Sequence, residues 1–137
     1  MDSVFADTNL LLDWLGKREP FFEPARDLLI KAERKEITLL VSTLSFVTLA
    51  YILRKEIGAE KTLKALTGIR AIATVCSSGE KEIDLALVSR FKDFEDAFQY
   101  YTALNHRAAA FVTRNTKDFK HAEIPVMTAE EYLRGLG

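Results

Sequence analysis

Three aspartates stand where a predicted strand ends or a predicted helix begins. Asp7 directly follows the apolar run at residues 4–6, Asp96 lies in the first turn of a helix predicted from residue 93, and Asp118 comes four residues after a later strand. Carboxylates that converge without cationic partners repel one another, and an unpaired buried carboxylate is costly. Mg²⁺ or Mn²⁺, which prefer oxygen ligands, would relieve that repulsion. We therefore take Asp7, Asp96 and Asp118 as candidate metal-binding and catalytic residues.

Small polar residues accompany the first and last of these acids. Thr8 and Asn9 follow Asp7, and Thr113 and Asn115 precede Asp118. Such groups orient carboxylates or hold metal-bound waters, so we expect them to support the acids.

Each acid also has a simpler interpretation when it is taken alone. Asp7 is a possible N-cap of a helix that starts near Leu10, Asp96 a first-turn acid stabilised by the helix dipole, and Asp118 part of a solvated turn. We expect Asp93 to be the N-cap of the helix that carries Asp96 and to support the site without binding the metal directly, and Asp13 to be a surface acid. Only the three acids together favour a metal site.

Strands and helices alternate along the chain. Apolar runs predict strands at 2–6, 37–42, 71–75, 108–114 and 124–128, and helical spacing predicts helices at 9–15, 20–36, 43–58, 59–68, 79–91, 93–107 and 129–136. This order predicts an α/β fold, a three-layer α/β/α sandwich with a central, mostly parallel sheet, in a single domain over residues 1–137. Sites of such sheets lie beyond the carboxyl ends of the strands, where Asp7 is placed.

The composition narrows the class of protein and its setting. The chain has 137 residues, a net charge of −1 and one cysteine, which fits a reducing, cytoplasmic location, and no apolar run is long enough to span a membrane. A polyanion would need local basic patches, and Arg54, Lys55 and Arg114 are candidate RNA phosphate contacts.

Four stretches, in order, resemble the PIN domain family, and within it the VapC-type toxin ribonucleases. They read VFADTNLLLDWL, VSTLSFVTLAYILRK, DFEDAFQYYTAL and VTRNTKDF, the last followed by IPVMTAEEYL. The resemblance implies cleavage of single-stranded RNA with Mg²⁺ or Mn²⁺, an antitoxin partner and a homodimer. It assigns Asp7 as the first family acid, Asp96 as the third and Asp118 as the fourth, with Thr113 and Asn115 leading to the last.

The chain departs from this pattern at one acid. The family usually has a glutamate six residues past the serine that ends the second strand, and counting from Ser42 reaches Thr48. We expect Thr48 to face the same pocket as the acids, where its hydroxyl, which brings no charge, would support a metal-bound water. Two functions therefore stay open: a ribonuclease that works with three carboxylates, and a PIN-fold module that binds RNA or protein with little or no catalysis. A phosphoacceptor receiver domain fits poorly, because it needs a pair of acids after the first strand and only Asp7 is there. A haloacid-dehalogenase-type phosphatase also fits poorly, because it needs a second aspartate two residues after Asp7, and that residue is Asn9.

Overall fold

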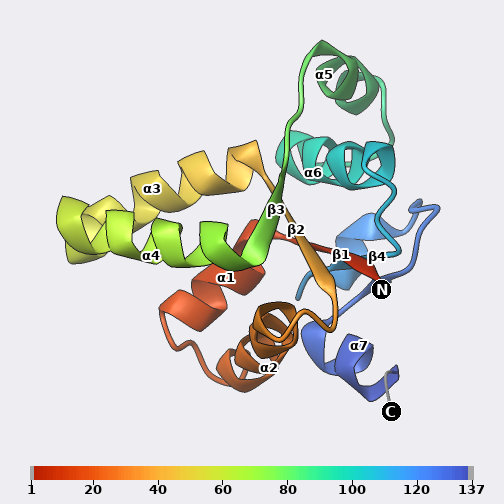
Figure 1. Ribbon diagram of the computed structural model, residues 1–137. Helices are drawn as coiled ribbons and strands as arrows, with labels where there is room; N and C mark the ends of the chain where they lie inside the picture. The colour runs from red at the N-terminus through yellow and green to blue at the C-terminus, as the bar shows by residue number, and fades with distance from the viewer. Residues whose placement is uncertain (1, 136–137) are drawn as a thin grey trace.

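Short apolar runs form the strands of a parallel sheet in the computed structural model, which describes residues 2–135 (Figure 1). The strand order is β3-β2-β1-β4-β5, and every neighbouring pair is parallel. The strands are β1 (Ser3–Ala6), β2 (Thr38–Ser42), β3 (Ala73–Cys76), β4 (Ala110–Val112) and β5 (Val126–Met127). The central strand β1 is thus enclosed by β2 and β4.

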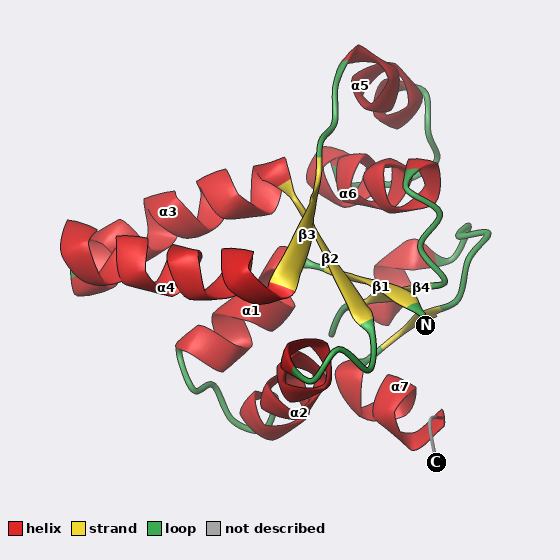
Figure 2. Ribbon diagram, in the orientation of Figure 1, coloured by secondary structure: helices red, strands yellow, loops and turns green. Residues whose placement is uncertain are grey.

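Helices cover both faces of this sheet because successive strand residues point to opposite sides. Val4 and Ala6 pack with the helices of one face, and Phe5 packs into a separate aromatic core on the other. The first face carries α1 (Thr8–Leu15), α2 (Phe22–Glu33), α3 (Thr43–Ile57), α4 (Ala59–Ile72) and α7 (Ala129–Gly135). The second carries α6 (Phe94–Asn105) and the short 3₁₀ helix η1 (Thr116–Phe119), with α5 (Glu80–Leu87) packed beside α6. Figure 2 shows α5 and α6 across the strands from α1, α2 and α7.

Two strands pass directly into helices at the carboxyl edge of the sheet. Asp7 follows β1 and caps α1, its side chain accepting a hydrogen bond from the Thr8 amide. Ser42 ends β2 and caps α3, accepting from the Ser45 amide. Each cap satisfies one of the free amides of a helix N-terminus. The same edge therefore gathers polar side chains from several elements.

The predicted fold class is confirmed, whereas several predicted boundaries differ. The predicted end of a helix at Gly68 is wrong: α4 continues to Ile72, and β3 starts at Ala73 rather than at residue 71. A glycine inside a helix costs only about 1 kcal/mol, and the fully buried Ile69 ties the following turn to the core. The strands predicted at 108–114 and 124–128 shorten to β4 and β5, and the helix predicted at 79–91 shortens to α5.

Within residues 2–135, the helices are too short or too polar to cross a bilayer. The last predicted helix is present as α7, and its predicted end at residue 136 lies outside the described residues.

Candidate active site

Asp7 is held by hydrogen bonds at the end of the central strand. Its Oδ1 accepts from the Thr8 amide at 2.9 Å, and its Oδ2 accepts from the Thr113 hydroxyl at 2.9 Å and from Asn9 Nδ2 at 3.4 Å. The Asn9 amide also donates to Thr113 Oγ1 at 3.3 Å, and so does the Asn115 backbone amide, at the same distance. The structure thus brings together all four small polar residues that we predicted, two from each side of the β1–β4 pair.

Burial governs the ionisation of Asp7. Only 7% of the residue is exposed, and this loss of water raises the pKa of Asp7 from 3.8 to about 6. The hydrogen bonds from Thr113 and Thr8 lower the pKa by less than burial raises it, and the charges of Glu95 and Asp93 raise it further. The interpretation of Asp7 as an N-cap is confirmed, and its role at a metal site stays a prediction.

Asp96 lies in the first turn of α6, where the charges of the other acids act on it. Its pKa is raised from 3.8 to about 7, first by burial and then by the charges of Asp7, Asp93, Asp118 and Glu95. Asp93 is the N-cap of α6, as predicted, and accepts from the Asp96 amide at 2.9 Å. These acids therefore share one electrostatic neighbourhood.

A cavity of about 430 Å³ opens beside these acids, and Asp93, Asp96 and Asp118 line it. Asp118 lies on η1, and the buried Phe119 next to it anchors this short helix in the core. Asp7 is not among the residues that line this cavity. The sequence-predicted acids thus share one end of the sheet, with Asp7 the most deeply buried.

A buried polar network ties α6 to the strand ends next to Asp7. The fully buried Gln99 accepts from the Ser42 hydroxyl at 2.6 Å, and its amide nitrogen donates to Ser45 Oγ at 2.8 Å and to Thr8 Oγ1 at 3.1 Å. The hydroxyls of Thr8 and Ser45 also bond to each other at 2.7 Å. Gln99 lies one turn after Asp96, so this network holds the helix that carries Asp96 against the strand that carries Asp7.

The chemistry of the donor atoms around Asp7 suits a hard cation. Asp7, Asp96 and Asp118 offer carboxylate oxygens, and Asn9 Oδ1 is buried without a hydrogen-bond partner beside Asp7. An orphaned buried oxygen next to like charges fits Mg²⁺ or Mn²⁺ chemistry. Among residues 2–135, however, no three His, Cys, Asp or Glu side chains are grouped closely enough to hold a metal.

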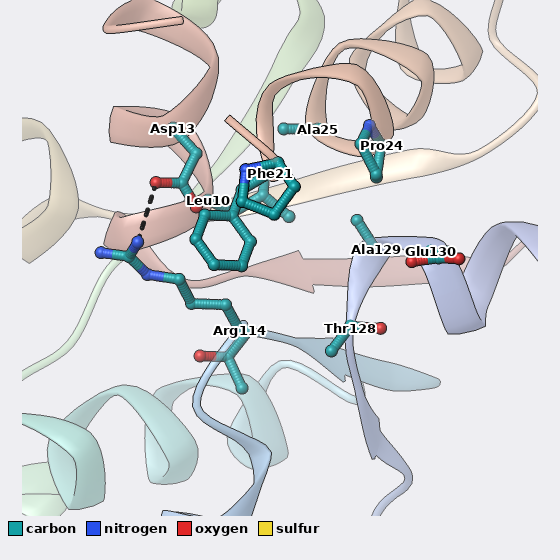
Figure 3. Close-up of a pocket in the computed structure, with 11 residues that line it drawn as sticks. Leu10, Asp13, Phe21, Pro24, Ala25, Arg114, Thr128, Ala129 and Glu130 are labelled. Carbon is teal, nitrogen blue, oxygen red and sulfur yellow. Dashed lines mark ion pairs between the residues drawn. The ribbon is translucent and has the colours of Figure 1, made fainter. Parts of the chain in front are cut away.

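Asp13 is buried, so its predicted position on the surface is wrong. It is 2% exposed, and its Oδ1 lies 3.3 Å from Arg114 Nη1 in an ion pair without hydrogen-bond geometry (Figure 3). The Arg114 guanidinium also lies 4.9 Å from the centre of the Phe21 ring. The three residues line an apolar pocket of about 150 Å³, where α1 turns Asp13 inward on the same face as Leu10. Arg114, a candidate RNA contact, is thus engaged within the fold.

The remaining predicted residues lie on α3. Thr48 is half-buried and is not among the residues that line the acidic cavity, so its orientation toward the acids stays a prediction. Arg54 and Lys55 lie in the last turn of α3, where Lys55 Nζ donates to the Tyr51 hydroxyl at 2.7 Å and lies 4.1 Å from its ring centre. They line a separate hollow.

Sequence reasoning missed two groups around the acids. One is the Gln99 network, whose only signal was the position of Gln99 one turn after Asp96 on a helix with buried neighbours. The other is the set of basic side chains that line the acidic cavity: Arg90, Lys92, Lys117, Lys120 and His121.

Comparison with known proteins fits this geometry. A family model described as "PIN domain" matches residues 3–117. The chain belongs to the PIN domain family. A comparison with curated proteins found no match. The family assignment therefore comes from the family model and agrees with the resemblance seen in the four sequence stretches.

Solved structures share the PIN fold at low identity. A toxin-antitoxin complex from Klebsiella pneumoniae aligns with a TM-score of 0.70 and 24% identity, over 92% of this chain and 97% of that one. VapBC2 from Rickettsia felis, bound to a promoter DNA fragment, aligns with a TM-score of 0.69 and 18% identity, over 91% of this chain and 96% of that one. VapC20 from Mycobacterium tuberculosis, a Sarcin-Ricin loop cleaving toxin, aligns with a TM-score of 0.62 and 15% identity, over 79% of this chain and 86% of that one. At these identities the likeness establishes the fold, as in VapC toxins.

Proposed function

We propose that this PIN domain is a divalent-metal-dependent endoribonuclease that cuts single-stranded RNA. One observation carries the proposal: Asp7 and Asp96 are partly or wholly buried, repel each other, and have no ion-pair partner among residues 2–135. Such an arrangement costs stability unless a cation balances it, and perturbed carboxylates in a cleft are typical of functional sites.

Asp7, Asp96 and Asp118 would hold Mg²⁺ or Mn²⁺. When bound, the cation supplies Lewis-acid activation of water and neutralises charge on the scissile phosphate. The Thr113 hydroxyl and the Thr8 amide fix the orientation of Asp7 through their hydrogen bonds. Gln99 keeps the helix of Asp96 against the end of β1. The chain's own residues thus position the carboxylates, as supporting groups do around metal ligands.

A second candidate function follows from Thr48. The threonine brings a hydroxyl and no charge to the position of the usual family glutamate, and fewer charged ligands weaken cation affinity. A PIN-fold module that binds RNA or protein without efficient cleavage is therefore the alternative.

We extend the proposal to partners and location. Similar structures include toxin-antitoxin complexes, which supports a cognate antitoxin for this chain. A homodimer and a cytoplasmic location complete the proposal, the latter supported by the single cysteine.

The deciding experiment measures cleavage of a labelled single-stranded RNA with Mn²⁺, with Mg²⁺ and with chelator. Wild type should cleave only with a divalent cation, and Asp96→Asn should lower the rate by on the order of 100-fold or more, beyond what supporting groups contribute. Asp84→Asn, an exposed acid on α5, is the matched control and should keep the wild-type rate. Binding of RNA without cleavage would favour the alternative function, and cleavage in chelator would contradict the proposed one.

A further inference from the structure

Basic side chains surround the cavity that holds the acids. Arg90 and Lys92 come from the loop before α6, and Lys117 and Lys120 come from η1 and the residue after it. We call these four residues the basic rim. All four are exposed, and none takes part in an ion pair within the described part of the chain. Their charges are therefore available to a ligand.

Two phenylalanines, the half-buried Phe91 and the buried Phe119, bring the halves of the basic rim together. Phe91 stands between Arg90 and Lys92, and Phe119 stands between Lys117 and Lys120. The two rings meet edge to face with centroids 5.5 Å apart. The rings pack on the aromatic core while the flanking basic residues are exposed, so the aromatic contact holds the two basic segments next to each other.

The aromatic contact is part of a larger cluster on the second face of the sheet. Phe91 also packs on Tyr100 at 5.2 Å, and Phe119 packs on Phe111 of β4 at 4.7 Å. In Figure 1 the loop into α6 and the segment that follows β4 both lie beside α6. The basic rim is thus built on rigid core contacts, although its segments lie far apart in sequence.

We propose that the basic rim binds the phosphates of a single-stranded RNA, which then crosses the acidic cavity between the two pairs of cations. The proposal rests on the proposed function and names the surface that would position its substrate. Acids alone would repel a polyanion, so cations must flank them if RNA is to approach. Since the chain carries a net charge of −1, its attraction for RNA has to be local, and this is the cavity where cations and candidate catalytic acids meet.

The basic pair on α3 is a weaker choice for this role. Lys55 already donates to Tyr51 and lies over its ring, and the hollow that Arg54 and Lys55 line contains no acid. A strand held there would have no carboxylate beside it in the same hollow. The pair nevertheless provides a direct rival for the experiment.

Salt dependence of RNA binding tests the proposal. Fluorescence anisotropy of a labelled single-stranded RNA, in chelator so that no cleavage occurs, gives affinity at 50 to 200 mM salt. Each lost phosphate contact lowers the log–log slope by about 0.7, so Arg90→Gln/Lys92→Gln and Lys117→Gln/Lys120→Gln should each lower it by about 1.4. Between 50 and 200 mM salt, the affinity of each variant should therefore fall by a factor about seven times smaller than the factor for wild type. Lys61→Gln/Lys64→Gln on α4 removes two charges elsewhere and should keep the wild-type slope.

The outcomes separate this inference from the proposed function. If both rim variants lose slope, the inference stands even when wild type fails to cleave RNA with Mn²⁺. If the rim variants keep the wild-type slope while wild type cleaves, the inference fails and the function survives. The inference is also overturned if only Arg54→Gln/Lys55→Gln lowers the slope. It is overturned as well if wild type does not bind RNA at low salt. Equal binding of a polyglutamate peptide of matched charge would mark an acidic-protein surface and also overturn the RNA assignment.

Discussion

Replacing Asp7 with asparagine should make the metal-free protein more stable. The pKa of Asp7 is about 6 in the fold against an ordinary 3.8, so the folded state binds this proton more tightly than the unfolded state does. The resulting contribution to stability is fully present below pH 3.8 and is lost as the pH rises through 6. Above that pH the charged carboxylate destabilises the fold, and an amide removes the charge.

The size of the effect follows from the two pKa values. At ~1.4 kcal/mol for each pH unit, the difference between about 6 and 3.8 is worth ~3 kcal/mol at pH 8. Asparagine caps a helix as well as aspartate does, so the bond from the Thr8 amide is kept. The new amide nitrogen cannot accept from the Thr113 hydroxyl, and that hydroxyl already accepts from Asn9 and Asn115, so this bond is lost at a cost of about 1–2 kcal/mol. We expect a net gain of about 1–2 kcal/mol, or roughly 3–8 °C in Tm.

Denaturation in chelator at pH 8 and at pH 5 measures this gain. At pH 5 the gain should shrink by about 1.4 kcal/mol, because most of the folded wild-type Asp7 is then protonated. Asp84→Asn, which changes an exposed acid in the same way, should stay within about 0.5 kcal/mol of wild type. An Asp7→Asn protein that is less stable than wild type at pH 8 would show that the charge of Asp7 does not destabilise the fold.

Three further substitutions test other parts of the structure. Gln99→Met should lower the free energy of unfolding by about 1–3 kcal/mol and also weaken Mn²⁺ binding. Thr102 is a buried α6 residue that bonds to Ser78, and Thr102→Val should lower stability without changing Mn²⁺ binding. If calorimetry finds the same Mn²⁺ affinity for Gln99→Met and wild type, Gln99 does not position Asp96. Arg114→Met should cost about 2–3 kcal/mol in urea denaturation by stranding the buried Asp13, and the added change Asp13→Leu should recover most of that loss. Thr48→Glu should tighten Mn²⁺ binding by about 10–100-fold and lower the apo Tm; a variant that changes neither shows that Thr48 does not face the acids.

Much of the fold could be predicted from the sequence because the strands are nearly all apolar and the helices have clear periodicity. Val4 to Ala6 and Leu39 to Val41 are buried on both faces of the sheet, as continuous apolar runs predict. The end of α4 was missed because a glycine resembles a stop signal, while the decisive contact of Ile69 is tertiary. Local propensity contains no information about that contact.

The convergence of the candidate acids at one end of the sheet could be predicted from the order of strands and helices, whereas the side chains around these acids could not. Residues that follow parallel strands meet at one edge, which placed Asp7 beside Thr113. The burial of Asp13 depends on Arg114, which lies about a hundred residues further along the chain. The basic rim likewise depends on the packing of Phe91 against Phe119. Pairs of this kind arise only when the chain is folded.

Calorimetric titration of the apo protein with Mn²⁺, repeated in buffers of different ionisation heat, tests the central claim that Asp7 and Asp96 bind a cation. The pKa values of about 6 and about 7 mean that the two carboxylates together hold about one proton at pH 6.5, and a cation must displace it. We predict release of about one proton per Mn²⁺ at pH 6.5 and almost none at pH 8.5, with both signals reduced in Asp96→Asn. Binding without proton release at pH 6.5, or no binding at millimolar Mn²⁺, would contradict the metal site.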